Sequence, residues 1–152
     1  ILVLVVAAVF GAAFAYFLPI VMTIDRQQKN LERMLLIAIS VMAEDDIKEI
    51  VVYDDHVQRA KAPIAVVEAP EEQAALISAL KKAQPWTPNH PRPQSRFYLV
   101  VRLHQGPDIE FSVITLERSP GEMFIHMISD GVMVGSVRSK ALFEWFRDNG
   151  YL

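Results

Sequence analysis

The histidines and serines are the residues whose types could do chemistry by themselves. The histidines are His56, His90, His104 and His126, and none pair at the helical spacing of a metal site. His104 and His126 can share a sheet face, but they belong to different strands and are expected several residues out of register. No serine lies in a Gly-x-Ser-x-Gly elbow, the strained turn that exposes a nucleophile. We therefore expect neither a catalytic residue nor a metal site.

The acidic clusters and the charge balance narrow the function classes further. Glu44-Asp45-Asp46 and Asp54-Asp55 lack the spacing of a calcium loop and are typical of solvated turns. The chain has no cysteine, which excludes disulfides, iron–sulfur clusters and thiolate zinc sites. Its net charge is −3, and no basic stripe runs along it. These features predict a protein that is not an enzyme, carries no cofactor and binds no nucleic acid.

The N-terminal segment is the most hydrophobic part of the 152-residue chain, and residues 1–22 contain no charge. About 20 apolar residues in a helix cross a hydrocarbon core of roughly 30 Å. We therefore predict one transmembrane helix over residues 1–23, embedded in the lipid bilayer. The alternative is a cleaved signal peptide, but the run is long for one and lacks a small-x-small cleavage site after its apolar part.

Small residues predict a contact face on this helix. Such residues let two helices approach closely in lipid, and here they include Ala8, Gly11, Ala12 and Ala15. This face is expected to pack on other membrane proteins. The basic residues that follow favour a cytoplasmic domain, whereas signal-anchored proteins more often place the large domain outside. We leave the side open, with the balance toward an extracytoplasmic domain.

Residues 24–46 are expected to form a juxtamembrane helix. Its apolar residues recur at steps of three or four, with Met34 and Val41 widening a stripe made of Leu31, Leu35, Ala38 and Met42. Residues 34–43 are nearly all apolar yet too few to span a bilayer, so they should be buried against the domain or a partner. A strand over residues 36–42 is the competing interpretation.

Residues 47–152 predict a small α+β domain with a mainly antiparallel sheet and two packed helices. Pro70 begins the first helix and Ser139 can cap the second. Residues 84–95 hold four prolines and read as an irregular loop. The expected strands are 47–53, 63–68, 96–104, 109–117, 123–129 and 132–137, with a four-residue loop at 105–108 and a type II turn at 119–122.

These turns assign the strand residues to two faces. The core face, covered by the middle helix, is expected to hold Phe97, Leu99, Val101, Leu103, Ile114, Leu116, Met123, Ile125 and Met127. The second face is expected to hold Tyr98, Arg102, His104, Phe111, Val113, Thr115, Phe124 and His126. Its mixed composition is typical of an interface, which makes Tyr98, Arg102, His104, Phe124 and His126 candidate partner contacts. Alternatively the C-terminal helix covers it through Leu142, Phe143 and Phe146, and Trp145 becomes a further candidate contact.

The function that fits these features is a non-catalytic, single-pass accessory or structural subunit of a larger membrane protein complex. It would bind its partners through the helix and the sheet surface, in a hetero-oligomeric complex. A membrane-tethered sensor or ligand-binding domain is a further alternative.

The beginning of the chain also resembles the type IV pilins and pseudopilins. The resemblance lies in an apolar helix from the first residue, Pro19 about one bilayer along, an amphipathic continuation and an antiparallel sheet. That family usually opens with Phe and has a glutamate where Val5 stands, so the chain departs from the pattern at both places. The resemblance implies a filament subunit.

Overall fold

The computed structural model describes residues 22–23, 26–54, 62–86 and 92–152. The predicted membrane segment, with its small residues Ala8, Gly11, Ala12 and Ala15, lies outside the described residues. Within the described ranges, no helix is both long enough and apolar enough to cross a membrane. The chain divides into two compact units, residues 1–30 and 31–152, and the second unit holds the whole sheet.

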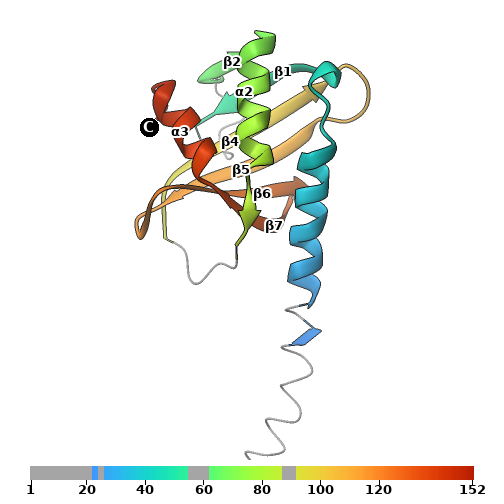
Figure 1. The fold of residues 1–152 in the computed structure, drawn as a ribbon, viewed down its shortest axis with the longest axis vertical. Coiled ribbons are helices and arrows are strands. Elements are labelled where there is room, and N and C mark those ends of the chain that lie inside the picture. The colour runs from blue at the N-terminus through green and yellow to red at the C-terminus, as the bar shows by residue number, and fades with distance from the viewer. Residues whose placement is uncertain (1–21, 24–25, 55–61, 87–91) are drawn as a thin grey trace, which may run out of the picture. The chain divides into compact units, whose positions relative to one another are not determined.

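The fold of the second unit is α+β, as the sequence predicts, with one seven-stranded antiparallel sheet (Figure 1). The strands follow the order β2-β1-β4-β5-β6-β7-β3, so β2 and β3 form the edges. Their bounds are β1 Ile47–Tyr53, β2 Ala65–Val67, β3 Gln84–Pro85, β4 Pro93–Leu103, β5 Ile109–Leu116, β6 Ser119–Ser129 and β7 Val132–Ser139. The two edge strands are very short, which limits the open edge that each presents.

The helices begin and end where local sequence signals place them. One helix covers residues 26–41 and is followed by the 3-10 turn η1, Glu44–Asp46. Helix α2, Pro70–Lys81, starts with proline at its first position and acidic residues in its first turn. Helix α3, Lys140–Asp148, is capped by Ser139, whose Oγ accepts a hydrogen bond from Leu142 N at 3.1 Å. That hydroxyl also donates to Ala79 O at 2.8 Å, which ties the start of α3 to α2.

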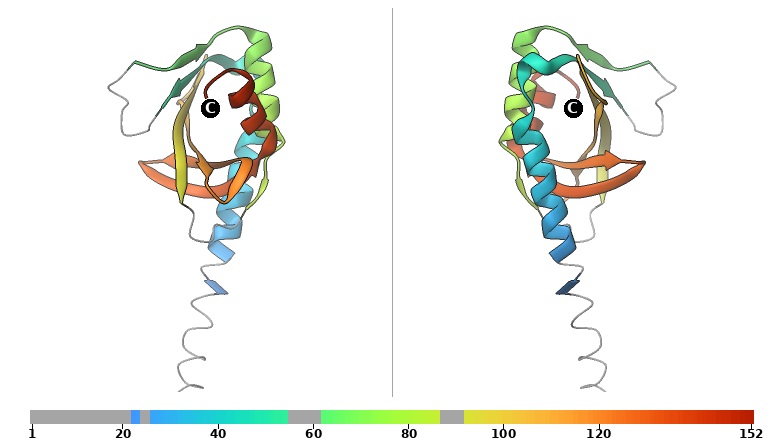
Figure 2. Two further views of the ribbon diagram at one scale, coloured as in Figure 1. Left: turned by 90° about the vertical axis from the view of Figure 1, so that its left-hand side faces the viewer. Right: turned by 90° about the vertical axis from the view of Figure 1, so that its right-hand side faces the viewer.

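Helices α2 and α3 and residues 31–41 of the first helix pack on the same face of the sheet. Figure 2 shows α2, α3 and residues 31–41 on one side of the strands. The shared core contains Leu35 and Ile39 from the first helix, Leu76 and Leu80 from α2, and Phe146 from α3. The prediction that the middle helix covers this face is confirmed. The interpretation in which the C-terminal helix covers the second face is wrong, because the buried Leu142 and Phe146 belong to this core and the Phe146 ring lies 4.9 Å from that of Phe97.

The predicted faces are correct for β4 and β6 but wrong for β5. The expected hairpin loop would pair Phe97 with Leu116, whereas Phe97 pairs with Val113, three residues earlier along β5. The pairing of β5 with β6 differs from the prediction by the same three residues. Strand β6 already begins at Ser119, so the predicted turn at 119–122 lies inside that strand. An odd shift moves every side chain of a strand to the other face. Phe111, Val113 and Thr115 therefore lie on the core face, and Ile114 and Leu116 lie on the second face.

Candidate interaction surface

The part of the first helix that belongs to the second unit, residues 31–41, carries apolar side chains on two sides, and its inner side packs into the domain. Leu35, Ile39 and Met42 are almost completely buried in the core. Gly135 of β7 permits this close approach, because a Cβ there would lie 2.9 Å from Leu31 O and 3.1 Å from Leu35 Cβ. Gly135 also has a φ of +68°, in the region that favours glycine. The sequence thus provides a backbone recess for the inner side of the helix.

The outer side of the same helix is also apolar, although it faces solvent. Four side chains, here called the outer stripe, are exposed by 37%, 59%, 60% and 71%: Leu31, Met34, Ile37 and Val41. They recur at steps of three and four, which places them along one side of the helix. A helix at the surface of a domain normally carries polar residues there. An exposed row of large apolar side chains therefore makes this side of the helix the candidate contact surface.

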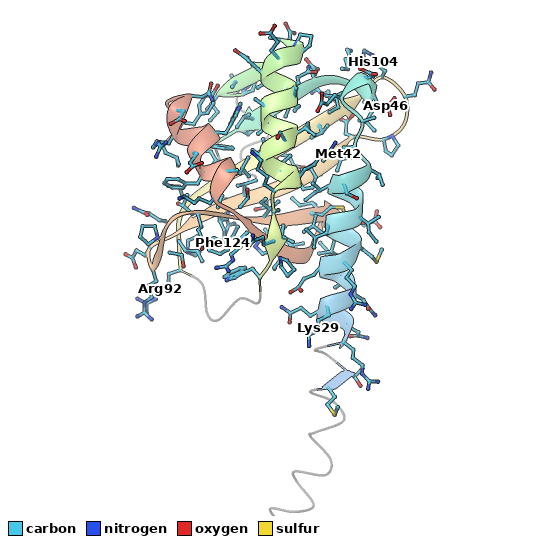
Figure 3. The ribbon with its side chains drawn as sticks, viewed as in Figure 1. Lys29, Met42, Asp46, Arg92, His104 and Phe124 are labelled. Atoms are coloured by element: carbon cyan, nitrogen blue, oxygen red, sulfur yellow. The ribbon has the colours of Figure 1, made fainter. Side chains whose placement is uncertain are left out.

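A groove of about 230 Å³ opens beside the end of the outer stripe. It lies between the end of the helix and the β4–β5 hairpin, and its lining is Ala38, Val41, Met42, Ala43, Asp46, Leu103 and Ile109. Asp46 is the one charged residue of that lining. The backbone N–H of His104 donates to Asp46 O at 2.8 Å, which holds η1 against the end of β4 (Figure 3).

The residues after the helix give this end of the surface a negative charge. Glu44, Asp45 and Asp46 are all exposed, and among the described residues none of the three makes an ion pair. They follow directly on the C-terminal end of the helix, which itself carries partial negative charge. The outer stripe thus ends in an acidic cluster that has no ion-pair partner in the part of the chain that the structure describes.

The second face of the sheet carries a row of polar side chains that cross four strands. Tyr53, Tyr98, Ser112 and His126 lie directly opposite one another on β1, β4, β5 and β6, and we call them the polar row. His126 Nδ1 lies 3.0 Å from Ser136 Oγ and 3.0 Å from the carbonyl oxygen of Gly135. Tyr98 and Ser112 are fully buried. The middle of the polar row therefore lies beneath neighbouring side chains, whereas Tyr53 and His126 at its two ends are partly exposed.

Burial sets the electrostatics of the polar row. Desolvation lowers the pKa of His126, opposed by its hydrogen bond to Gly135 and reinforced by the charge of Arg96. A serine beside a histidine is the arrangement of a nucleophile and its base, but Ser136 is only 7% exposed, which leaves little access for a substrate. No group of three metal-ligating side chains exists in the part of the chain that the structure describes.

The predicted contact residues on the second face differ in accessibility. Tyr98 and Phe124 are fully buried, and the ring of Trp86 lies 4.1 Å from that of Phe124. Arg102 pairs with Glu49 and, at 3.8 Å, with Asp108. These residues share the face with His126, but they are engaged mainly with their own neighbours.

The remaining predicted contacts lie elsewhere. His104 is exposed just beyond the end of β4, near the groove. Trp145 lies on α3, where its ring is 5.4 Å from that of Phe146 and 5.7 Å from that of Tyr151. The candidates are thus spread over three places and form no single site.

A second depression, of about 480 Å³, lies where α2 ends and α3 begins. Its charged lining includes Arg138, which pairs with Glu122 at 3.4 Å, and Lys140, which pairs with Glu144 at 3.7 Å. These two cations already have carboxylate partners, and Lys82, the third cation of the lining, is exposed, so the depression is a solvated surface of mostly paired charges.

The outer stripe is a candidate contact surface that was not among the sites predicted from the sequence. Its signal was present in the nearly continuous apolar run of residues 34–43, which is wider than one buried side of a helix requires.

Comparison with known proteins adds no relative, since no family model, curated protein or solved structure matches the chain. The functional interpretation therefore rests on the surfaces described above.

Proposed function

We propose that this protein is a non-catalytic, single-pass accessory subunit of a larger membrane protein complex. Residues 1–23 form the transmembrane helix, and the α+β domain binds a larger partner in a hetero-oligomer. The observation that carries the proposal is the outer stripe: four exposed apolar side chains on a helix whose opposite side is already buried.

The outer stripe has enough apolar surface to contribute to binding. Covering the exposed half of a large aliphatic side chain stabilises a complex by roughly 1 kcal/mol. Met34, Ile37 and Val41 are each more than half exposed. With Leu31, they would supply about 3–4 kcal/mol, a meaningful part of a specific interaction.

The location of the stripe in the chain favours a membrane protein as the partner. Leu31 follows shortly after the charge-free run of residues 1–22. A domain tethered by such a run is confined near the bilayer, so the proteins that it meets most often share that membrane. The side of the membrane is part of the proposal, with the domain placed outside the cytoplasm.

The absence of cysteine makes the proposal directly testable. Met34→Cys, Ile37→Cys and Val41→Cys, each labelled with a benzophenone maleimide in native membranes, are expected to form a photo-adduct with one larger membrane protein. Ser78→Cys, an exposed position on α2, is the matched control and should give no such adduct.

The masses of the adducts separate the possible outcomes. An adduct larger than two copies of the chain supports the accessory subunit. The chain has a mass of 17.2 kDa. An adduct of twice that mass would instead favour a filament of identical subunits. Stripe positions that react no more than Ser78→Cys would overturn the proposal.

A further inference from the structure

We propose that the groove beside Val41 receives a lysine or arginine side chain from a helix of the partner. The inference rests on the proposed function and names the chemistry of the partner at the same surface. The juxtaposition that carries it is a mainly apolar groove whose lining includes the acidic residue Asp46, at the end of the exposed outer stripe.

The lining of the groove matches a long basic side chain. Lysine and arginine have an apolar stem of three or four methylene groups and a cationic head. The stem would lie along Val41, Leu103 and Ile109, and the head would reach the carboxylate of Asp46. A cavity of about 150 Å³ can hold benzene, so a groove of about 230 Å³ has room for one such side chain.

The charge around the groove favours a cation over an apolar residue. Asp46 is preceded by the acidic residues Glu44 and Asp45. The helix that ends at residue 41 adds the negative end of its dipole. An apolar side chain in the groove would desolvate the Asp46 carboxylate without a partner, which costs free energy. A guanidinium or ammonium group would compensate it with a charge-assisted hydrogen bond.

The same charges argue against a second copy of this chain as the occupant. Two copies anchored in one membrane run parallel, and a twofold contact brings the same residues of each copy together. Glu44, Asp45 and Asp46 would then face their own equivalents at the level of the groove. Arg33 is the one basic residue within the span of the stripe, and it lies near the end of the stripe that is farther from Asp46. A different protein, with basic residues at the level of Asp46, fits the surface.

The test uses the full chain in native membranes, with the benzophenone probe on Ile37→Cys, outside the groove lining. Asp46→Asn removes the charge at nearly constant size, and Ala38→Leu fills the groove. Each is expected to lower the adduct yield about fivefold, the effect of losing roughly 1 kcal/mol of interaction. The matched controls are Asp45→Asn, which does not line the groove, and Ala75→Leu, exposed on α2; both should change the yield less than twofold.

A second readout identifies the occupant itself. With the probe on Val41→Cys, the cross-linked peptide is expected to come from another protein and to contain lysine or arginine within two helical turns of the attachment site. Peptides without a basic residue, or a peptide of this same chain, would overturn the inference.

The outcomes separate the two proposals. If Ile37→Cys forms its adduct and neither Asp46→Asn nor Ala38→Leu lowers the yield, the groove inference fails while the accessory-subunit proposal stands. If no stripe position forms an adduct, the accessory-subunit proposal fails and the groove inference fails with it.

Discussion

The outer stripe is an apolar surface, and the second face of the sheet is a mixed apolar and polar surface. They differ in how far the domain itself already buries their side chains. Tyr98 and Phe124 on the sheet are fully buried, and the ring of Trp86 packs against that of Phe124. Ile37 and Val41 on the helix remain mostly exposed, although the other side of that helix is buried. Composition alone made the sheet face the stronger interface candidate, whereas exposure favours the helix.

This difference predicts that neighbouring positions on the helix respond in opposite ways. Leu35→Ala removes a fully buried side chain and is expected to lower the free energy of unfolding by about 3 kcal/mol. Met34→Ala, on the outer stripe, should change it by less than about 0.5 kcal/mol, because the side chain is largely exposed. Urea denaturation of the full chain in mild detergent measures both, and equal losses would contradict the division into an inner and an outer side.

Much of the fold was predictable because its signals are local. Strand β1 has the predicted bounds, α2 starts at Pro70, and Ser139 caps α3 as expected. The face of β5 was not predictable, since it depends on hairpin registers. In the first hairpin Val101 pairs with Ile109, which leaves residues 102–108 outside the paired register. In the second, the register shifts between Thr115 and Leu116 where β6 contains Gly121.

The candidate surface was only half predictable, for a different reason. Periodicity predicted a juxtamembrane helix over residues 24–46 with an apolar stripe, but Met34 and Leu35 are both hydrophobic members of that stripe. Which of them is buried depends on Gly135 and β7, about a hundred residues later in the chain. The groove likewise requires Asp46, Leu103 and Ile109 to meet, and only the sheet topology brings them together.

The partly buried position of His126 on the second sheet face predicts a pH effect. Burial lowers its pKa in the folded protein below the ordinary value of 6.5, so the unfolded chain binds a proton first as the pH falls. The contribution of neutral His126 to the free energy of unfolding is fully present above about pH 6.5. It decreases as the pH falls below about 6.5 and levels off once the pH is below the lowered pKa of the folded protein. Each unit of lowering corresponds to about 1.4 kcal/mol.

Denaturation of the wild-type chain and the His126→Gln variant between pH 8 and pH 5 checks this expectation. The variant should lose less stability on acidification than the wild type, because its amide does not titrate. Parallel curves for the two proteins would show that His126 is accessible to water in the folded state, and the second face would then regain its place as an open surface.

The smallest expected effect belongs to Ser112, at the centre of the polar row. Its hydroxyl is fully buried and has no hydrogen-bond partner among the described residues. Replacing it by alanine removes a desolvated polar group and no hydrogen bond, so Ser112→Ala should change the free energy of unfolding by less than about 0.5 kcal/mol or increase it slightly. Ser139→Ala is the matched comparison, because the Ser139 hydroxyl caps α3 and donates to Ala79 O; its loss should cost about 1–2 kcal/mol. If Ser112→Ala cost as much as Ser139→Ala, the Ser112 hydroxyl would have a partner such as a buried water, and the polar row would be a hydrogen-bonded network instead of tightly packed side chains.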